Sequence, residues 1–482
     1  MTLGGSLQTV SNDVLNLESS AGSIGLVMNR TKCEVINSGP LPADLSISGF
    51  RLIHPQEAEL LGAPLFAGAT LDGLLDKCCA EFAIAEERLS LISAHDALLL
   101  LKSSLGVSKL MHLLRSSPCT GHRLLSTFDE ALKRCLSKIT NIDLTDEQWE
   151  QASLSVKAGG LGVRPASQLA PSAFLASLAA SLELQSLILS VSSLPTTAQE
   201  MDAQSVWSCL SSKPPPTGTQ ATKQHNWDSP IIDTKLSQLS SRQTCKARLL
   251  AVSADHSSDW LHALPIASCG LRLSDEAVRV AVGIRLGAPI CQPHQCPCGT
   301  LVDSSGSHAL SCKRTSARIL RHNALNEVIF RALIKAGIPS TKEPPGLSRT
   351  DGKRPDGVTQ IPWTAGKCLA WDVTVTDTLA PSYRHLSSIS AGKAAERAAD
   401  AKVGKYSSIT ASHDFLPLAF ETLGPINSTA IEFISALGKK LCCVSGDPRE
   451  GSFLFQRLSM TIQRFSSVAL HDTFDLSETE DQ

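Results

Sequence analysis

The chain has 482 residues, which is more than one hydrophobic core of ordinary size needs and enough for two to four domains. Its 42% hydrophobic and 19% charged residues are typical of a globular protein, and its net charge of −2 excludes a basic field over the whole molecule. The sequence has 15 cysteines, no signal-peptide pattern and no apolar run of transmembrane length, which favours reduced thiols inside a cell and argues against a membrane protein.

The N-terminal part is predicted to be mainly helical. Residues 1–65 hold short apolar segments separated by Gly and Pro, whereas in residues 70–190 apolar side chains recur every three or four positions. This period predicts amphipathic helices, for example over Leu71–Phe82, Ala94–Leu105 and Phe128–Ile139. The paired glycines of KAGGLGVRP, residues 157–165, predict a tight turn.

Residues 195–230 differ in composition from the rest of this part. Ser, Pro and Thr dominate, as in SSKPPPTGTQ, and such a stretch buries little apolar surface, so we expect a linker or, equally, a surface insertion loop. Residues 231–290 return to a helical pattern. There SDEAVRVAVGIRLG predicts a helix with Ser274 as its N-cap and acidic residues in its first turn.

A cysteine–histidine cluster follows from residue 291. Four ligands suited to tetrahedral zinc stand in the pattern C-x-C-x9-H-x3-C: Cys296, Cys298, His308 and Cys312. Gly299 and Gly306 between them allow the backbone to fold around an ion. Cys291 and His294 are alternative ligands, and chance clustering in a cysteine-rich chain is the alternative to a metal site. We expect a structural Zn²⁺, because four protein ligands close the coordination sphere.

Local positive charge begins directly after the cluster. Between Lys313 and Arg354 there are ten Lys or Arg and three Asp or Glu. A solvated helix face explains part of this surplus, and a surface that faces phosphates explains it better.

The C-terminal region is predicted to be a mixed α/β domain. A helical pattern covers residues 321–337, and an Ala-rich helix covers about 390–406. Strand patterns cover Lys342–Leu347, Gly357–Ile361, Cys368–Thr376 and Phe415–Thr422. Two closing helices are expected over 428–445 and 455–470. The resulting order, helix–strand–strand–strand–helix–strand, is typical of a mixed domain.

Two carboxylates stand at unusual places in the expected strands. Asp356 follows Pro355, whose ring fixes the backbone at the entry to a strand. Asp372 lies in LAWDVTV, where alternation places it on the face opposite Trp371. A carboxylate inside a strand is costly unless it is satisfied, and a hard cation such as Mg²⁺ satisfies it. The alternative is a pair of acids in surface loops.

A metal-dependent nuclease also needs a cation against the negative charge of its transition state. The position two after Asp372 is Thr374 rather than lysine, so the candidates come from AKVGKY. There Lys402 and Lys405 are three positions apart and share one face of the Ala-rich helix. Glu343, in TKEPPG, is a candidate third acid.

Together, the cysteine–histidine cluster, KRPDG, LAWDVTV and KVGKY resemble the C-terminal endonuclease of site-specific non-LTR retrotransposons. That domain is restriction-enzyme-like, of the PD-(D/E)xK fold, and a zinc-knuckle-like motif precedes it. The resemblance implies that Asp356 and Asp372 bind the metal. It also implies that the catalytic lysine has moved from the strand to the following helix, which fits Lys402 or Lys405.

The upstream half resembles the end of a reverse transcriptase. GLVMNRTKCEVI (residues 25–36) and LLGAPL (60–65) are similar to its last palm segments, and DALLLLKSSLGVSKLMHLLRSSP and KAGGLGVRP to its thumb and the connector beyond. The implied fold is an α+β multidomain chain in which a mainly helical thumb and connector region precedes a mixed α/β endonuclease domain. The expected domains are a palm remnant (1–65), helical thumb and connector (66–194), linker (195–230), helical connector (231–290), zinc-knuckle-like motif (291–314) and restriction-like endonuclease (315–475).

The expected function is that of a 5′-truncated retroelement protein. In such polymerases the catalytic Asp-Asp pair precedes a segment like TLGGS, so we expect no polymerase activity, but a Mg²⁺-dependent DNA endonuclease that nicks a target strand. The implied partners are DNA, the element's RNA and a full-length retroelement protein, in an intracellular location that is nuclear if the protein functions. The alternative is a catalytically inactive nucleic-acid-binding remnant.

Overall fold

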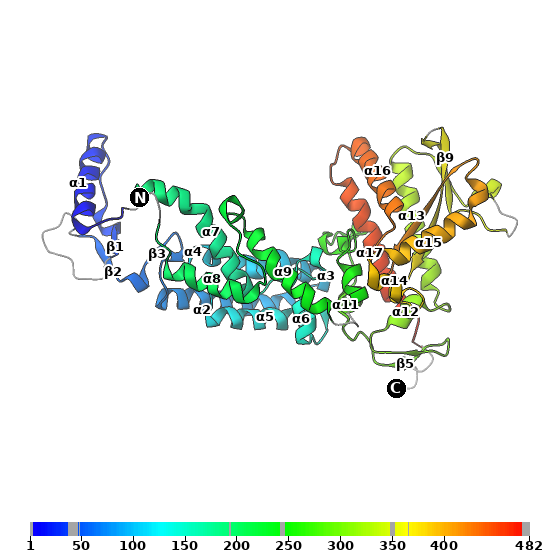
Figure 1. Cartoon of the computed structure of the whole chain (residues 1–482), viewed down its shortest axis with the longest axis horizontal. Coiled ribbons are helices and arrows are strands. Elements are labelled where there is room, and N and C mark those ends of the chain that lie inside the picture. The colour runs from blue at the N-terminus through cyan, green and yellow to red at the C-terminus, as the bar shows by residue number, and fades with distance from the viewer. Residues whose placement is uncertain are drawn as a thin grey trace. The chain divides into compact units, whose positions relative to one another are not determined.

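The computed structural model describes residues 3–36, 47, 49–191, 194–241, 246–347, 352–364 and 366–474 (Figure 1). The chain divides into two compact units. The first comprises Met1–Glu81, Lys109–Asp129 and Ala166–Asp228, and the second comprises Phe82–Ser108, Glu130–Pro165 and Ser229–Gln482. Helices and small sheets occur in both units, so the α+β class expected from the sequence is confirmed.

The first unit is mainly helical, with two small sheets. Strands β1 (Glu34–Ile36) and β2 (Arg51–Ile53) pair in parallel, and β3 (Glu59–Leu60) and β4 (Ala63–Pro64) pair antiparallel. Its helices are α1 (Leu7–Ser23), α4 (Met111–Ser116), α7 (Ala166–Leu189) and α8 (Ala198–Leu210), and α7 packs against α4 and α8. Three helices include residues of both units: α2 (Ala69–Leu89), α5 (Arg123–Thr140) and α9 (Gln224–Ser240).

The stretch expected to be a linker contains α8 and a buried aromatic pair. Trp207 and Trp227 are 1% and 4% exposed, and their rings meet edge to face with centroids 5.2 Å apart. The Nε1–H of Trp207 donates to the carbonyl oxygen of Trp227 over 2.8 Å. The Ser, Pro and Thr content thus understates the apolar surface that this stretch buries, because two large side chains supply it.

The helical part of the second unit confirms two local predictions. Its helices are α3 (Ala94–Leu100), α6 (Asp146–Ala152), α10 (Lys246–Val252) and α11 (Asp275–Leu286). Ser274 is the N-cap of α11, and its hydroxyl accepts the N–H of Ala277 over 3.3 Å. In the expected turn, Gly159 has a φ of +86°, and a Cβ on Gly160 would lie 2.1 Å from the carbonyl oxygen of Leu154.

A four-stranded sheet forms the C-terminal part of the second unit (Figure 1). Its order is β10-β9-β8-β7; β9 and β10 are parallel, and the other neighbours are antiparallel. The strands are β7 (Ser340–Lys342), β8 (Gly357–Thr364), β9 (Lys367–Thr376) and β10 (Asp414–Glu421). The helices are α13 (Ala317–Lys335) before the sheet, α14 (Arg384–Ile389) and α15 (Lys393–Lys405) between β9 and β10, and α16 (Ser428–Ser445) and α17 (Glu450–His471) after it.

Helices cover both faces of this sheet. On one face Leu369, Trp371 and Val373 of β9 pack with apolar residues of α13, α16 and α17. On the other face Ala370 of β9 packs with Tyr406 and Ile409, which follow α15. The alternation expected for LAWDVTV is therefore confirmed, and Asp372 lies on the face that α15 covers.

Several element boundaries differ from the sequence predictions. The expected strand Lys342–Leu347 is wrong: β7 ends at Lys342 and a 3₁₀ turn, Pro345–Leu347, follows, because two prolines follow Glu343 and that residue has a φ of +48°. The expected helix over 390–406 is confirmed as α15, which begins three residues later, after Gly392 with its φ of +78°, and α14 is a further helix that precedes the expected range. The last helix is longer than the expected 455–470, and the predicted strands β8, β9 and β10 are confirmed.

Two stretches are long and apolar enough to cross a membrane by length and composition alone, which the sequence analysis did not anticipate. They are Ala94–Ser116 and Ala166–Leu189, with mean hydropathies of 1.4 and 1.5. In α7 the buried side chains, from Ala166 to Ala176, belong to the first half of the helix. Core helices of soluble proteins meet the same criteria, so these stretches are weak evidence for a membrane span.

Candidate metal centres

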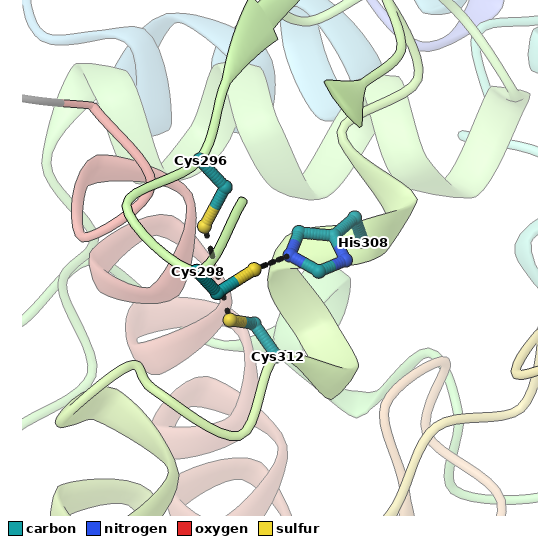
Figure 2. A group of neighbouring side chains, drawn as sticks. All are labelled: Cys296, Cys298, His308 and Cys312. Carbon is teal, nitrogen blue, oxygen red and sulfur yellow. Dashed lines mark hydrogen bonds between the residues drawn. The ribbon is translucent and has the colours of Figure 1, made fainter. Parts of the chain in front are cut away.

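Four cysteine and histidine side chains point toward one another in the second unit (Figure 2). One ligand atom from each of Cys296, Cys298, His308 and Cys312 lies within 4.8 Å of the others. The sulfur atoms of Cys296 and Cys312 are 3.8 Å apart, and that of Cys298 lies 3.2 Å from Nε2 of His308. Tetrahedral zinc with Zn–S bonds of about 2.3 Å separates two sulfur ligands by about 3.8 Å, so these residues fit the ion.

A hairpin and a one-turn helix bring these ligands together. Strands β5 (His294–Gln295) and β6 (Leu301–Val302) pair antiparallel, and the turn between them carries the first two ligands. Gly299 in that turn has a φ of +87°. The third ligand lies on α12 (Ser307–Ser311) and the fourth directly follows it. Gly306, before α12, has a φ of +63°, and a Cβ there would lie 2.8 Å from Cδ1 of Ile290. Both glycines expected to shape the site are thus required by local geometry.

The environment of the cluster suits a structural metal. Cys296 and Cys312 are each 3% exposed and pack with the fully buried Val302. Hydrogen bonds with Thr300 lower the pKa of the Cys298 thiol to about 6, which favours the thiolate form that metals bind. Four protein ligands leave no open coordination position for a reacting water.

The two alternative ligands have other partners. The thiol of Cys291 donates to the carbonyl oxygen of Asp303 over 3.3 Å. The His294 ring stacks on Phe474 with centroids 4.0 Å apart, and its Nε2 lies 2.9 Å from the hydroxyl oxygen of Thr473. The ligand set is therefore the four residues of the predicted pattern.

Asp372 is a buried carboxylate in the interior of β9. It is 3% exposed, and its Oδ2 forms an ion pair with Nζ of Lys402. Burial, and secondly the negative charge of Asp356, raise the pKa of the Asp372 carboxyl, whereas Lys402 lowers it. Lys402 thus offsets only part of the cost of burying the Asp372 carboxylate near a second acid.

Asp356 enters this site from the start of β8. Its main-chain N–H donates to the carbonyl oxygen of Trp371 over 3.0 Å, and its Oδ2 accepts the N–H of Val373 over 2.6 Å. These bonds place Asp356 beside the residues on either side of Asp372. A Cβ on Gly357 would lie 2.1 Å from the Trp371 ring, so only glycine permits this close pairing of β8 and β9.

The structure separates the two candidate lysines. Lys402 lies in the last turn of α15 and reaches Asp372. The ammonium of Lys405 lies 3.1 Å from the Tyr406 hydroxyl and 4.5 Å from the centre of that ring. The Tyr406 hydroxyl in turn donates to the carbonyl oxygen of Arg354 over 2.8 Å, which fixes the chain that leads to Asp356.

The candidate third acid is directed elsewhere. The backbone N–H of Glu343 donates to the carbonyl oxygen of Asp356 over 3.0 Å, but its carboxylate pairs with Arg354 and is 65% exposed. Among the described residues, the structure therefore brings together Asp356, Asp372 and Lys402, and leaves the Glu343 carboxylate at the surface.

Two residues of α13 that the sequence analysis did not single out complete the site. Nε2 of His322 lies 2.9 Å from Oδ2 of Asp356, and this hydrogen bond raises the pKa of His322. Asn326 accepts the Nε1–H of Trp371 over 2.8 Å and donates to the carbonyl oxygen of Asp356 over 3.4 Å. The two polar residues are four positions apart in RHNALN, a spacing that puts them on one face of the helix.

The two acids of this second site are the kind of side chain that could hold a hard divalent cation. The two acidic side chains interact through their charges, since the pKa of Asp372 is raised by burial and secondly by the negative charge of Asp356. Mg²⁺ is held in proteins by one or two carboxylates together with water and phosphate oxygens. A divalent cation would offset the repulsion between the two carboxylates.

Scanned against models of known protein families, the chain matches none, and no curated protein is significantly similar to it. The function is therefore inferred from the residues and the geometry of the two centres.

Proposed function

We propose that this chain contains a Mg²⁺-dependent DNA endonuclease of the restriction-like PD-(D/E)xK kind, of retroelement origin. The observation that carries the proposal is the meeting of Asp356, Asp372 and Lys402 at one place on the sheet, from three separate elements. The order α13-β7-β8-β9-α14-α15-β10 is consistent with it, since it is that of a mixed α/β domain, the class to which the proposed endonuclease domain belongs.

In this proposal each residue of the site has a separate role in the reaction. Asp356 and Asp372 would hold Mg²⁺, which supplies an activated water and polarises the phosphate when bound. Lys402, whose ammonium is preorganised against Asp372, places positive charge where negative charge develops on the phosphate oxygens. His322 and the N–H of Val373 both bind Oδ2 of Asp356 and so fix that carboxylate.

The cysteine–histidine cluster has a structural role in this proposal. Its four ligands would hold Zn²⁺ and stabilise a segment that has two short strands and one helical turn. The chain passes from the last ligand, Cys312, to the basic residues Lys313 and Arg314. Contacts from such residues to phosphates supply affinity and register but no choice of sequence.

Nicking of supercoiled plasmid by the purified full chain tests the proposal. With Mg²⁺, the wild type should convert supercoiled to open-circular DNA, and Asp356→Asn and Asp372→Asn should each abolish conversion. The matched control is Asp400→Asn, which removes an exposed acid from α15 and should leave the rate unchanged. A wild type that binds the plasmid without nicking it in Mg²⁺ or Mn²⁺ would instead support the catalytically inactive nucleic-acid-binding remnant.

A further inference from the structure

A cleft of about 420 Å³ lies between the start of α13, the end of β9 and α15. Five basic side chains line it: Lys313, Arg318, Arg321, His322 and Lys402. Its other lining residues are Thr315, Ile319 and the Val373–Val375 segment of β9, so no acidic side chain is among them. Lys402 also pairs with Asp372, which makes the cleft continuous with the carboxylate site.

The most buried of these cations, Arg321, is only partly satisfied by hydrogen bonds. Arg321 is 2% exposed, and of its guanidinium nitrogens Nη2 donates to the carbonyl oxygen of Leu310 over 3.3 Å. Nε and Nη1 of Arg321 have no hydrogen-bond partner in the described part of the protein. Buried polar groups without partners cost free energy, and an oxyanion bound beside the guanidinium would recover part of that cost.

Asp377, the acid whose charge acts on Arg321, is hydrogen-bonded to other groups. Burial lowers the pKa of Arg321 to about 10, and the negative charge of Asp377 partly opposes this shift. Oδ1 of Asp377 accepts hydrogen bonds from the Thr422 hydroxyl over 2.8 Å and from the N–H of Leu379 over 3.2 Å. At the mouth of the cleft, Lys313 and Arg318 are exposed and form no ion pair with any residue that the structure describes. The cleft therefore keeps an excess of positive charge.

We infer that this cleft is a phosphate-binding subsite, which holds the backbone of a DNA strand beside the phosphate that reacts at Asp356 and Asp372. The inference rests on the proposed nuclease function and deepens it by assigning the path of the substrate. A strand fits better than a free anion because cations line the cleft from the exposed Lys313 and Arg318 to Lys402 at the carboxylates. Lys313 directly follows Cys312 of the neighbouring cysteine–histidine cluster.

Binding of a fluorescently labelled DNA duplex to the full chain, measured by anisotropy at several salt concentrations, tests the subsite. Ca²⁺ replaces Mg²⁺ so that the duplex stays intact. The variant Lys313→Gln/Arg318→Gln changes only exposed residues, because replacement of the buried Arg321 endangers folding. Loss of two phosphate contacts should make the negative slope of log K against log salt shallower by about 1.8 and weaken binding on the order of 30-fold at about 0.15 M salt.

The control Arg331→Gln/Lys439→Gln removes the same charge from exposed positions outside the cleft and should bind as the wild type does. A wild type that binds through the cleft but does not nick supports the subsite while refuting the nuclease. Equal affinity and slope for the cleft and control variants would overturn the subsite. Displacement of the duplex by inorganic phosphate, at a concentration equal to that of the phosphate groups of the duplex, would also overturn the subsite, since it would indicate a site for free anions.

Discussion

Gly357→Ala should disrupt the carboxylate site through packing alone. The added Cβ would lie 2.1 Å from Cζ2 of Trp371, well inside van der Waals contact. Trp371 is fully buried, and its Nε1–H is bound to Asn326, so the ring has little freedom to move away. The strain must therefore separate β8 from β9 and displace Asp356, which precedes the substituted residue. We expect a loss of about 1–3 kcal/mol in the free energy of unfolding, typical of an overpacked core.

Two assays together test this reasoning. Chemical denaturation should show the loss of stability, and plasmid nicking should fall by at least tenfold under conditions in which the variant remains folded. Gly404→Ala is the control, because a Cβ there meets nothing within 4 Å, and alanine in a helix should stabilise by about 0.5–1 kcal/mol. A Gly357→Ala variant with wild-type stability and nicking would refute the account of how Asp356 is positioned.

Three further outcomes follow from other parts of the structure. The wild type should bind one equivalent of Zn²⁺ tightly, and Cys312→Ser should lose it while Cys209→Ser, at an exposed thiol, retains it; equal zinc content in both variants would contradict the assigned cluster. Burial lowers the pKa of His95 to about 4, so the unfolded chain takes up a proton first as pH falls below about 6.5. The free energy of unfolding, measured by urea denaturation, should therefore fall by about 3 kcal/mol as the pH is lowered from about 6.5 to 4. The fall should be smaller in His95→Gln, which lacks this imidazole, than in the control His385→Gln, which changes an exposed histidine. Trp207→Ala should cost about 3–5 kcal/mol in the unit that contains α8, yet leave plasmid nicking unchanged under folding conditions.

The parts of the site that are close in sequence could be predicted from it. The four clustered residues lie within residues 296–312, so their spacing and the intervening glycines predicted them, whereas setting aside Cys291 and His294 depended on the partners that the structure gives those two residues. Asp356 and Asp372 were identified because a proline before a strand and an acid within one are local signals. The helical period reduced the candidates for the catalytic cation to Lys402 and Lys405. Which of the two reaches Asp372 depends on how α15 packs on the sheet.

Contacts between distant elements could not be predicted in the same way. His322 and Asn326 reach Asp356 from a helix two elements earlier, and only the polar face of RHNALN could have indicated them. The direction of the Glu343 side chain depends on a positive φ at that residue and on its pairing with Arg354, which strand periodicity does not reveal. Composition also concealed the burial of Trp207.

The most direct test of the central claim compares two lysine variants that differ only in position on the same turn of α15. With Mg²⁺ and supercoiled plasmid, Lys402→Met should abolish nicking, because it removes the ammonium beside Asp372, while Lys405→Met should retain it. Both variants should bind the plasmid and remain folded. Retained nicking in Lys402→Met would contradict the assignment of this carboxylate and lysine site as the catalytic centre.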